Sequence, residues 1–301
     1  MTTNGRPARD VTLERACSRL SLSGSEPLRA TASRVRHWLL VEQPGAWGRD
    51  ALTESDLPSD VALALQRRAA DLGVRVVLIR RPGRTKTGSV RSAYVVHSGP
   101  GPVWARRLVL TSPHELLDLD LGAQLLDPTG SSDQPLYLVC TNGKHDLCCA
   151  VAGVPLARAL ARLGDVWECS HVGGHRFAAN LVCLPHGLYY GRVTPDIGLR
   201  IVERHARGEL LLTHLRGRSS YSFAVQAADI FVRQARALHR IDDLTLESVA
   251  AGPPVRCAFR SRADELLQVA VDIAPAALQR RLTCNGEPAA PPEYRARWDR
   301  A

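Results

Sequence analysis

The pattern of apolar residues predicts that one order of elements occurs twice along the chain. Each occurrence begins with a short apolar run typical of a buried strand, continues with a helical period, and ends in a strand and a hairpin. The first set comprises strands at 38–42, 75–79, 92–97 and 105–111 and a helix from Ser59 to Gly73. The second set comprises strands at 136–140, 166–169, 181–184 and 188–191 and a helix at 154–163. This repeated order predicts an α/β fold with two similar βαββ halves.

The rest of the chain predicts a polar lead-in and a C-terminal α/β extension. Thr194-Pro195-Asp196 has the capping hydroxyl, proline and acid of a helix start, and a second helix is expected at about 222–238. Further strands are expected near 244–249, 256–260 and 266–273. The predicted organisation is a flexible lead-in at 1–30, a first half at 31–130, a second half at 131–240 and an extension at 241–301.

Composition places the chain among globular proteins, with 45% hydrophobic and 23% charged residues. No apolar run is long enough to span a membrane, and residues 1–33 have no apolar signal core, so we expect a cytoplasmic protein that does not bind membranes. The net charge of +9 comes from dispersed arginines, and aromatic residues make up only 5% of the chain. This pattern is typical of a solvated basic surface rather than a nucleic-acid site. It suits docking to an acidic redox protein.

Cysteines and histidines gather in the second half. Cys140 ends the strand at 136–140, Cys149 follows nine residues later, and His171 and His175 flank a Gly-Gly pair. Thiolates and imidazoles brought to two strand ends favour a metal site over a disulfide. At the matching point of the first half stand Glu42 or Gln43, so that half is expected to hold no metal group.

Two longer motifs carry a family resemblance. They are Val139-Cys140-Thr141-Asn142-Gly143-Lys144 with Asp146 and Cys148-Cys149, and the run Glu168 to Asn180 around His171-Val172-Gly173-Gly174-His175. At these residues the chain resembles the sucrase/ferredoxin-like family, a branch of the thioredoxin-like [2Fe-2S] ferredoxins. The resemblance implies two thioredoxin-like halves and a [2Fe-2S] cluster held by Cys140, Cys149, His171 and His175. It implies an electron carrier or redox-responsive protein rather than a catalyst.

The main alternative is a Cys2His2 zinc protein with a structural or interaction role. Zinc-finger cysteines lie about two to four residues apart, whereas eight residues separate Cys140 from Cys149, which fits a bulkier group better. A thiol-exchange enzyme is disfavoured because no Cys-x-x-Cys occurs, and a hydrolase because no Gly-x-Ser-x-Gly occurs.

The other cysteines are given lesser roles. Cys148 is a buried neighbour or a substitute ligand, and Cys169, at the end of the strand at 166–169, is expected to face the core. The remaining four, which are expected only to pack, are Cys17, Cys183, Cys257 and Cys284.

Overall fold

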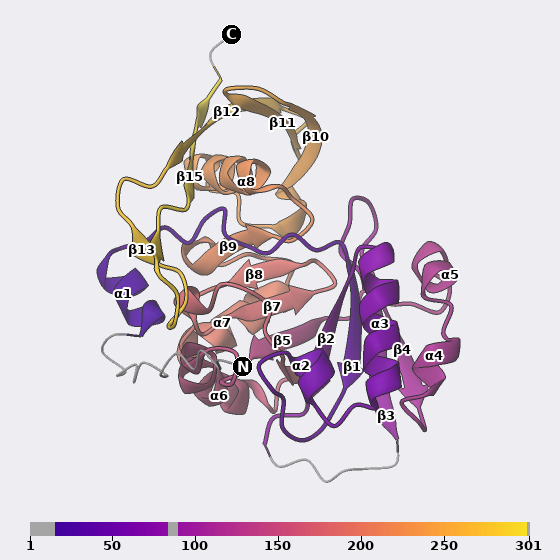
Figure 1. Ribbon diagram of the computed structural model, residues 1–301. Coiled ribbons are helices and arrows are strands. Elements are labelled where there is room, and N and C mark those ends of the chain that lie inside the picture. The colour runs from indigo at the N-terminus through magenta and orange to yellow at the C-terminus, as the bar shows by residue number, and fades with distance from the viewer. Residues whose placement is uncertain (1–15, 84–89, 300–301) are drawn as a thin grey trace.

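A nine-stranded mixed sheet forms the body of the protein, and a smaller sheet stands beside it (Figure 1). The computed structural model describes residues 16–83 and 90–299. The strand order in the large sheet is β4-β3-β1-β2-β6-β5-β7-β8-β9. Its strands are β1 (His37–Glu42), β2 (Val74–Arg80), β3 (Arg91–His97), β4 (Trp104–Leu110), β5 (Leu136–Cys140), β6 (Val166–Cys169), β7 (Leu181–Leu184), β8 (Leu188–Tyr190) and β9 (Leu215–Arg218). The expected α/β class is confirmed.

The strand pairings repeat in mirrored order about the centre of the sheet. β1 is parallel to β2 and antiparallel to β3, and β5 is likewise parallel to β6 and antiparallel to β7. The two sets join through a short antiparallel pairing of β2 with β6. In register, one row crosses the junction from Glu42 through Ile79 and Cys169 to Cys140. Glu42 is therefore the positional counterpart of Cys140.

The sheet curls so that one of its faces encloses a core shared by both sets of strands. Trp38 of β1 stacks on Tyr189 of β8 with ring centroids 6.2 Å apart, although the sheet order places four strands between them. Tyr94 of β3 meets Trp167 of β6 edge to face at 5.9 Å. These aromatic pairs bury large apolar surfaces between the two sets. The predicted domain division stays a prediction, and the sheet runs unbroken across its boundary at residue 130.

Helices cover the opposite face of the sheet and its edges. α3 packs on Leu39, Val41 and Leu78 of the first set, whereas α6 and α7 enclose Tyr137 and Val139 of the second. The helices are α1 (Cys17–Ser23), α2 (Ala51–Glu54), α3 (Ser59–Asp71), α4 (Glu115–Asp118), α5 (Leu121–Leu126), α6 (Leu147–Leu160), α7 (Pro195–Ala206) and α8 (Phe223–Arg236). The helix starts expected at Thr194 and Ser222 are confirmed, because both side chains accept the capping hydrogen bond.

Helix α6 begins seven residues before the expected position 154. Asp146 caps it by accepting a hydrogen bond from the Cys148 backbone N–H. Its first two turns are almost entirely apolar and small, so they lack the polar face from which an amphipathic helix is recognised. Gly153 lies so close to the Cys140 carbonyl that a Cβ would clash with it. The helix start is thereby pressed against the end of β5.

The C-terminal residues form the second sheet, of order β10-β11-β12-β15, with α8 against it. The three strands expected there are confirmed, whereas β9, β13, β14 and β15 were not predicted. The chain then returns toward the N-terminal helix, where β13 lies beside α1 (Figure 1). The strands of the second sheet are β10 (Leu244–Ala250), β11 (Val255–Ser261), β12 (Leu266–Pro275) and β15 (Pro292–Trp298). The strands β13 (Arg280–Arg281) and β14 (Pro288–Ala289) pair with each other. Within the described ranges, no helix combines the length and apolarity needed to cross a bilayer.

Candidate metal centre at the end of strand β5

Two buried thiols and a histidine meet where β5 ends and α6 begins. Cys140 is the last residue of β5, and Cys149 lies in the first turn of α6. The His171 Nδ1 atom is 3.9 Å from the Cys140 sulfur and 3.7 Å from the Cys149 sulfur. Both cysteines are almost completely buried, whereas His171 is half-buried. The three ligand atoms lie within 4.8 Å of one another, a spacing that a metal ion could bridge.

Three imidazoles continue the cluster away from the thiols. His175, the first residue of the 3-10 helix η2 (His175–Phe177), places its Nδ1 3.4 Å from His171 Nε2. His145, from the loop before α6, stacks on His171 with ring centroids 3.8 Å apart. The Nε2 atom of His175 is buried, has no hydrogen-bond partner among the described residues and lies 3.8 Å from Asp146 Oδ2. An orphaned imidazole nitrogen in a buried site is suited to binding a metal.

The protonation of these groups also suits metal ligation. A hydrogen bond from the Cys149 thiol holds the pKa of Cys140 well below its usual value, and the same bond raises the pKa of Cys149. Burial lowers the pKa of His175 to about 4, so its imidazole is neutral at neutral pH. Metals bind thiolates and neutral imidazoles. Cys140 is thus the thiol that loses its proton more readily, and His175 is already in the neutral form that binds metals.

A buried arginine fixes the glycine loop that carries the two predicted histidine ligands. Arg216, on β9, donates hydrogen bonds to the Gly173 carbonyl at 3.1 Å and to Asn180 Oδ1 at 2.7 Å. Gly173 and Gly174 have φ values of +99° and +75°, which favour glycine. A Cβ on Gly174 would also strike the Arg216 guanidinium, and one on Gly173 would strike Ser33. The glycines therefore let the loop lie close to its supporting side chains.

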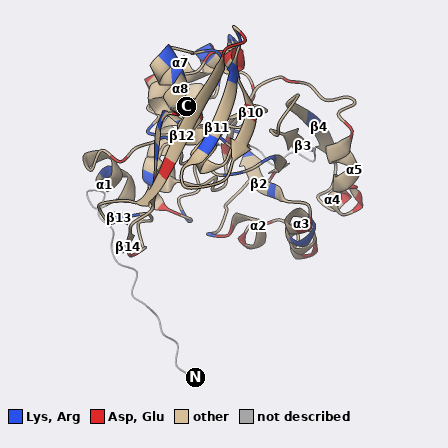
Figure 2. Ribbon diagram, turned by 90° about the horizontal axis from the view of Figure 1, so that it is seen from above, with Lys and Arg blue, Asp and Glu red and all other residues tan. Residues whose placement is uncertain are grey.

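Two of the imidazoles border a cleft between the two sets of strands. It is lined by His145 and His171 together with the loop before helix α2 and the start of that helix. Its rim has charges of both signs, from Arg49 and Arg75 and from Asp50 and Glu54. In the view of Figure 2, basic and acidic residues are likewise both scattered over strands and helices.

The structure brings three of the four predicted ligands into one group and links the fourth through His171. Cys140, Cys149 and His171 form one set of neighbouring donors, and His171 and His175 belong to a second set with His145. Cys169 is fully buried in the shared core beside Cys140, as expected. Sequence reasoning missed the contribution of His145, although it lies within the first family motif. Cys148 points instead into a different group, described below.

A profile of sucrase/ferredoxin-like proteins matches residues 28–217, which is more than half of the chain. The chain belongs to the sucrase/ferredoxin-like family. The match spans both sets of strands of the large sheet up to β9 and ends before α8. Searches of curated proteins and of solved structures find no significant match. The centre of this family member therefore consists of buried cysteine and histidine side chains that could hold a metal ion.

Proposed function

We propose that the protein binds a [2Fe-2S] cluster through Cys140, Cys149, His171 and His175 and acts as an electron carrier or a redox-responsive protein. When bound, such a cluster exchanges single electrons. The observation that carries the proposal is the convergence of Cys140, Cys149 and His171 at the end of β5, with His175 beside His171. Two thiolates and two neutral imidazoles form a known type of ligand set for a two-iron centre.

The surroundings of the donors support this role. The two cysteines are buried in the shared core and excluded from water, and His175 is buried too, whereas His171 lines the cleft. Electrons would therefore enter and leave on the side of His171. The recurring strand pairings support two thioredoxin-like halves, of which the second supplies all four ligands.

The cleft also suggests how a partner would dock. Arg49 and Arg75 stand on the same rim as His145 and His171. These arginines could attract an acidic patch on a reductase or an electron acceptor. Asp50 and Glu54 would repel a partner whose acidic residues lie opposite them, and so add specificity. We propose a redox protein as the partner and a cytoplasmic location. Neither nucleic acid nor membrane is proposed as a partner.

One observation favours a second candidate, a zinc site without redox activity. The ligand atoms of Cys140, Cys149 and His171 lie within 4.8 Å of one another, which is compact enough for a single ion. A titration distinguishes the two. The cluster proposal expects anaerobically purified protein to take up about one electron per chain from a low-potential reductant, with bleaching of its visible colour. A colourless protein that accepts no electrons would overturn it.

A further inference from the structure

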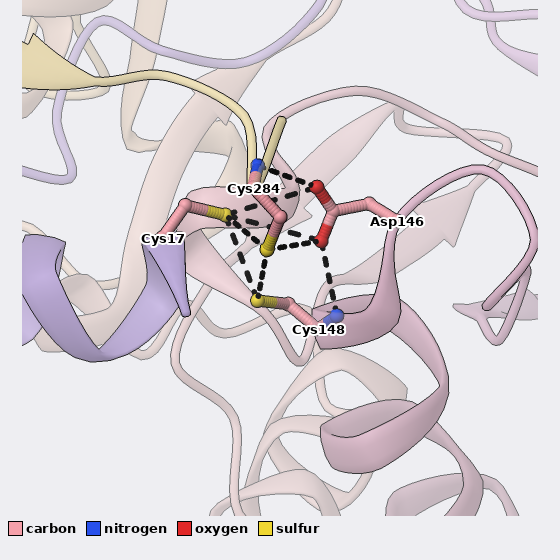
Figure 3. Close-up of side chains that lie close together, drawn as sticks. All are labelled: Cys17, Asp146, Cys148 and Cys284. Atoms are coloured by element: carbon pink, nitrogen blue, oxygen red, sulfur yellow. Dashed lines mark hydrogen bonds between the residues drawn. The ribbon is translucent and has the colours of Figure 1, made fainter. Parts of the chain in front are cut away.

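Three further cysteines meet on the other side of Asp146, and they come from distant parts of the chain. Cys17 is the first residue of α1, Cys148 lies in the first turn of α6, and Cys284 lies between β13 and β14. All three are buried. Figure 3 shows their sulfur atoms turned toward one another around the Asp146 carboxylate. The expectation that Cys17 and Cys284 only fill apolar space is therefore incomplete, because their neighbours are sulfurs and a carboxylate.

The distances fit one tetrahedral ion. The three sulfur pairs are separated by 3.5 Å (Cys17–Cys148), 3.4 Å (Cys148–Cys284) and 3.6 Å (Cys17–Cys284). A tetrahedral ion with metal–sulfur bonds of about 2.3 Å would place its sulfurs about 3.8 Å apart. A disulfide would need about 2.05 Å, and each of the eight cysteines is a free thiol. A cluster with several irons would hold its cysteine sulfurs farther apart than a single ion does.

Asp146 supplies the fourth position. Its Oδ1 is 3.2 Å from the Cys284 sulfur and 3.9 Å from the Cys17 sulfur. A tetrahedral zinc with one oxygen ligand would give sulfur–oxygen separations of about 3.6 Å. All four ligand atoms lie within 4.8 Å of one another. The carboxylate is held in place by the backbone N–H groups of Cys148 and Cys284, each 3.0 Å away.

The burial of the group also favours a cation. Asp146 is only 6% exposed, and its carboxyl group lies beside the buried thiols of Cys17 and Cys284. A buried carboxylate is costly without a counter-charge, and an ion bound by the thiols would supply one.

We propose that Cys17, Cys148, Cys284 and Asp146 bind one zinc-class divalent ion that fastens α1 and the β13–β14 segment to the start of α6. Three thiolates select a thiophilic metal, and four protein ligands close the site, as in structural zinc centres. The site shares no ligand with the group of Cys140, Cys149 and His171, although Cys148 precedes Cys149 directly in the sequence. This proposal is independent of the metal group at the end of β5.

The other cysteines provide the contrast. Cys169, Cys183 and Cys257 are as deeply buried, yet none belongs to a group of potential ligands in the described part of the chain. Burial alone therefore does not explain why three thiols from α1, α6 and the C-terminal segment share one point. The predicted extension at 241–301 thereby gains a role that its sequence did not indicate, since Cys284 completes the site.

The test is a metal analysis of the full-length protein purified from zinc-containing medium, with zinc, iron and acid-labile sulfide measured on one sample. We expect about one zinc per chain in the wild type. Cys17→Ser and Cys284→Ser should each lose the zinc and keep the iron and sulfide, while Cys257→Ser, a matched buried-cysteine control, should keep all three. Asp146→Asn removes the charge of a direct ligand, so it should weaken zinc binding by more than the roughly 10-fold loss typical of residues that only orient a ligand, as measured in competition with a chelator.

Several results would overturn the site. They are wild-type protein without zinc, zinc retained in both Cys17→Ser and Cys284→Ser, or zinc lost in Cys140→Ser instead. If the serine variants do not fold, wild-type protein stripped of zinc and titrated with cobalt(II) decides the matter. One equivalent should produce thiolate charge-transfer absorption and protect three thiols from alkylation, and its failure to do so would refute the proposal. Zinc without iron or sulfide would support this site while refuting the cluster.

Discussion

The two sets of strands in the large sheet share their pairings but differ in the chemistry at the strand ends. Glu42 and Cys140 occupy matching positions in one row of the sheet. Glu42 accepts a hydrogen bond from the Ser92 backbone at 2.8 Å, and Gln43 accepts one from Arg91 at 2.6 Å. In the first set these polar side chains therefore bind the start of the neighbouring strand β3. In the second set Cys140 turns to Cys149 and His171, so the same scaffold position becomes part of a candidate metal centre.

The comparison teaches that strand pairing sets where a site can lie, while a few residues at the strand ends decide whether it exists. Both sets also depend on the core between them, because Trp38 and Tyr94 of the first contact Tyr189 and Trp167 of the second. The first set thus contributes part of the core on which the second set packs. Each half of this comparison can be tested by substitution.

The largest effect is expected from matched substitutions at the strand ends and in the cysteine doublet. Cys140→Ser and Cys149→Ser should abolish iron binding and visible colour, because each removes a ligand at the centre. Glu42→Ser should keep both and lose only about 0.5–1.5 kcal/mol of stability with its hydrogen bond to Ser92. Cys148→Ser should leave the visible spectrum nearly unchanged. Iron content and absorbance spectra check these outcomes.

Two results would break this part of the comparison. If Glu42→Ser lost its iron as completely as Cys140→Ser, the first set would take part in binding. If Cys148→Ser were colourless and Cys149→Ser coloured, the ligand at the start of α6 would be misassigned.

A large loss of stability is expected from the shared core. Trp38 is fully buried, so Trp38→Ala should lower the free energy of unfolding by about 3–5 kcal/mol. Leu126, which is 86% exposed, is the control, since Leu126→Ala should change that free energy by no more than about 0.5 kcal/mol. Urea denaturation followed by circular dichroism gives both values. The account expects one transition, and separate transitions for the two sets would contradict a shared core.

A smaller effect concerns a buried polar triad beside the second set of strands. His205 Nδ1 lies 3.2 Å from the Tyr137 hydroxyl, and its Nε2 lies 3.1 Å from His186 Nδ1. Burial lowers the pKa of His205 to about 3, whereas the unfolded chain has a pKa of about 6.5. Below pH 6.5 the unfolded state binds more protons, so stability is complete above that pH and is lost as pH falls toward 3.

The slope attributable to His205 should reach about 1.4 kcal/mol per pH unit. His205→Gln should flatten the dependence of unfolding free energy on pH between 6.5 and 4. Denaturation curves of both proteins at several pH values measure the difference. Equal slopes for the two proteins would show that His205 is not held neutral by the fold.

Much of the fold follows from local patterns in the sequence. The strands with continuous apolar runs and the helices capped by Thr194 and Ser222 were predicted because their signals lie within a few residues. The start of α6 was placed too late, because residues 147–153 are apolar and show no helical period. β9 and β13–β15 were missed since they are short or mostly half-exposed, and their pairing partners determine them.

The cysteine and histidine sites were likewise predictable only in part. Cys140, Cys149, His171 and His175 stand in compact motifs, so family resemblance identified them together. The approach of Cys17 and Cys284 to Cys148 joins residues more than 130 positions apart, which no local pattern encodes. Only the return of the C-terminal segment to α1 brings them together.

The central claim is that the second set of strands binds a two-iron cluster which the first set cannot bind. The most direct measurement is iron and acid-labile sulfide per chain in anaerobically purified wild-type protein, with zinc measured on the same sample. The account predicts about two iron and two sulfide per chain, and their loss in Cys149→Ser. Stoichiometric zinc that depends on Cys149, with neither iron nor sulfide, would contradict it.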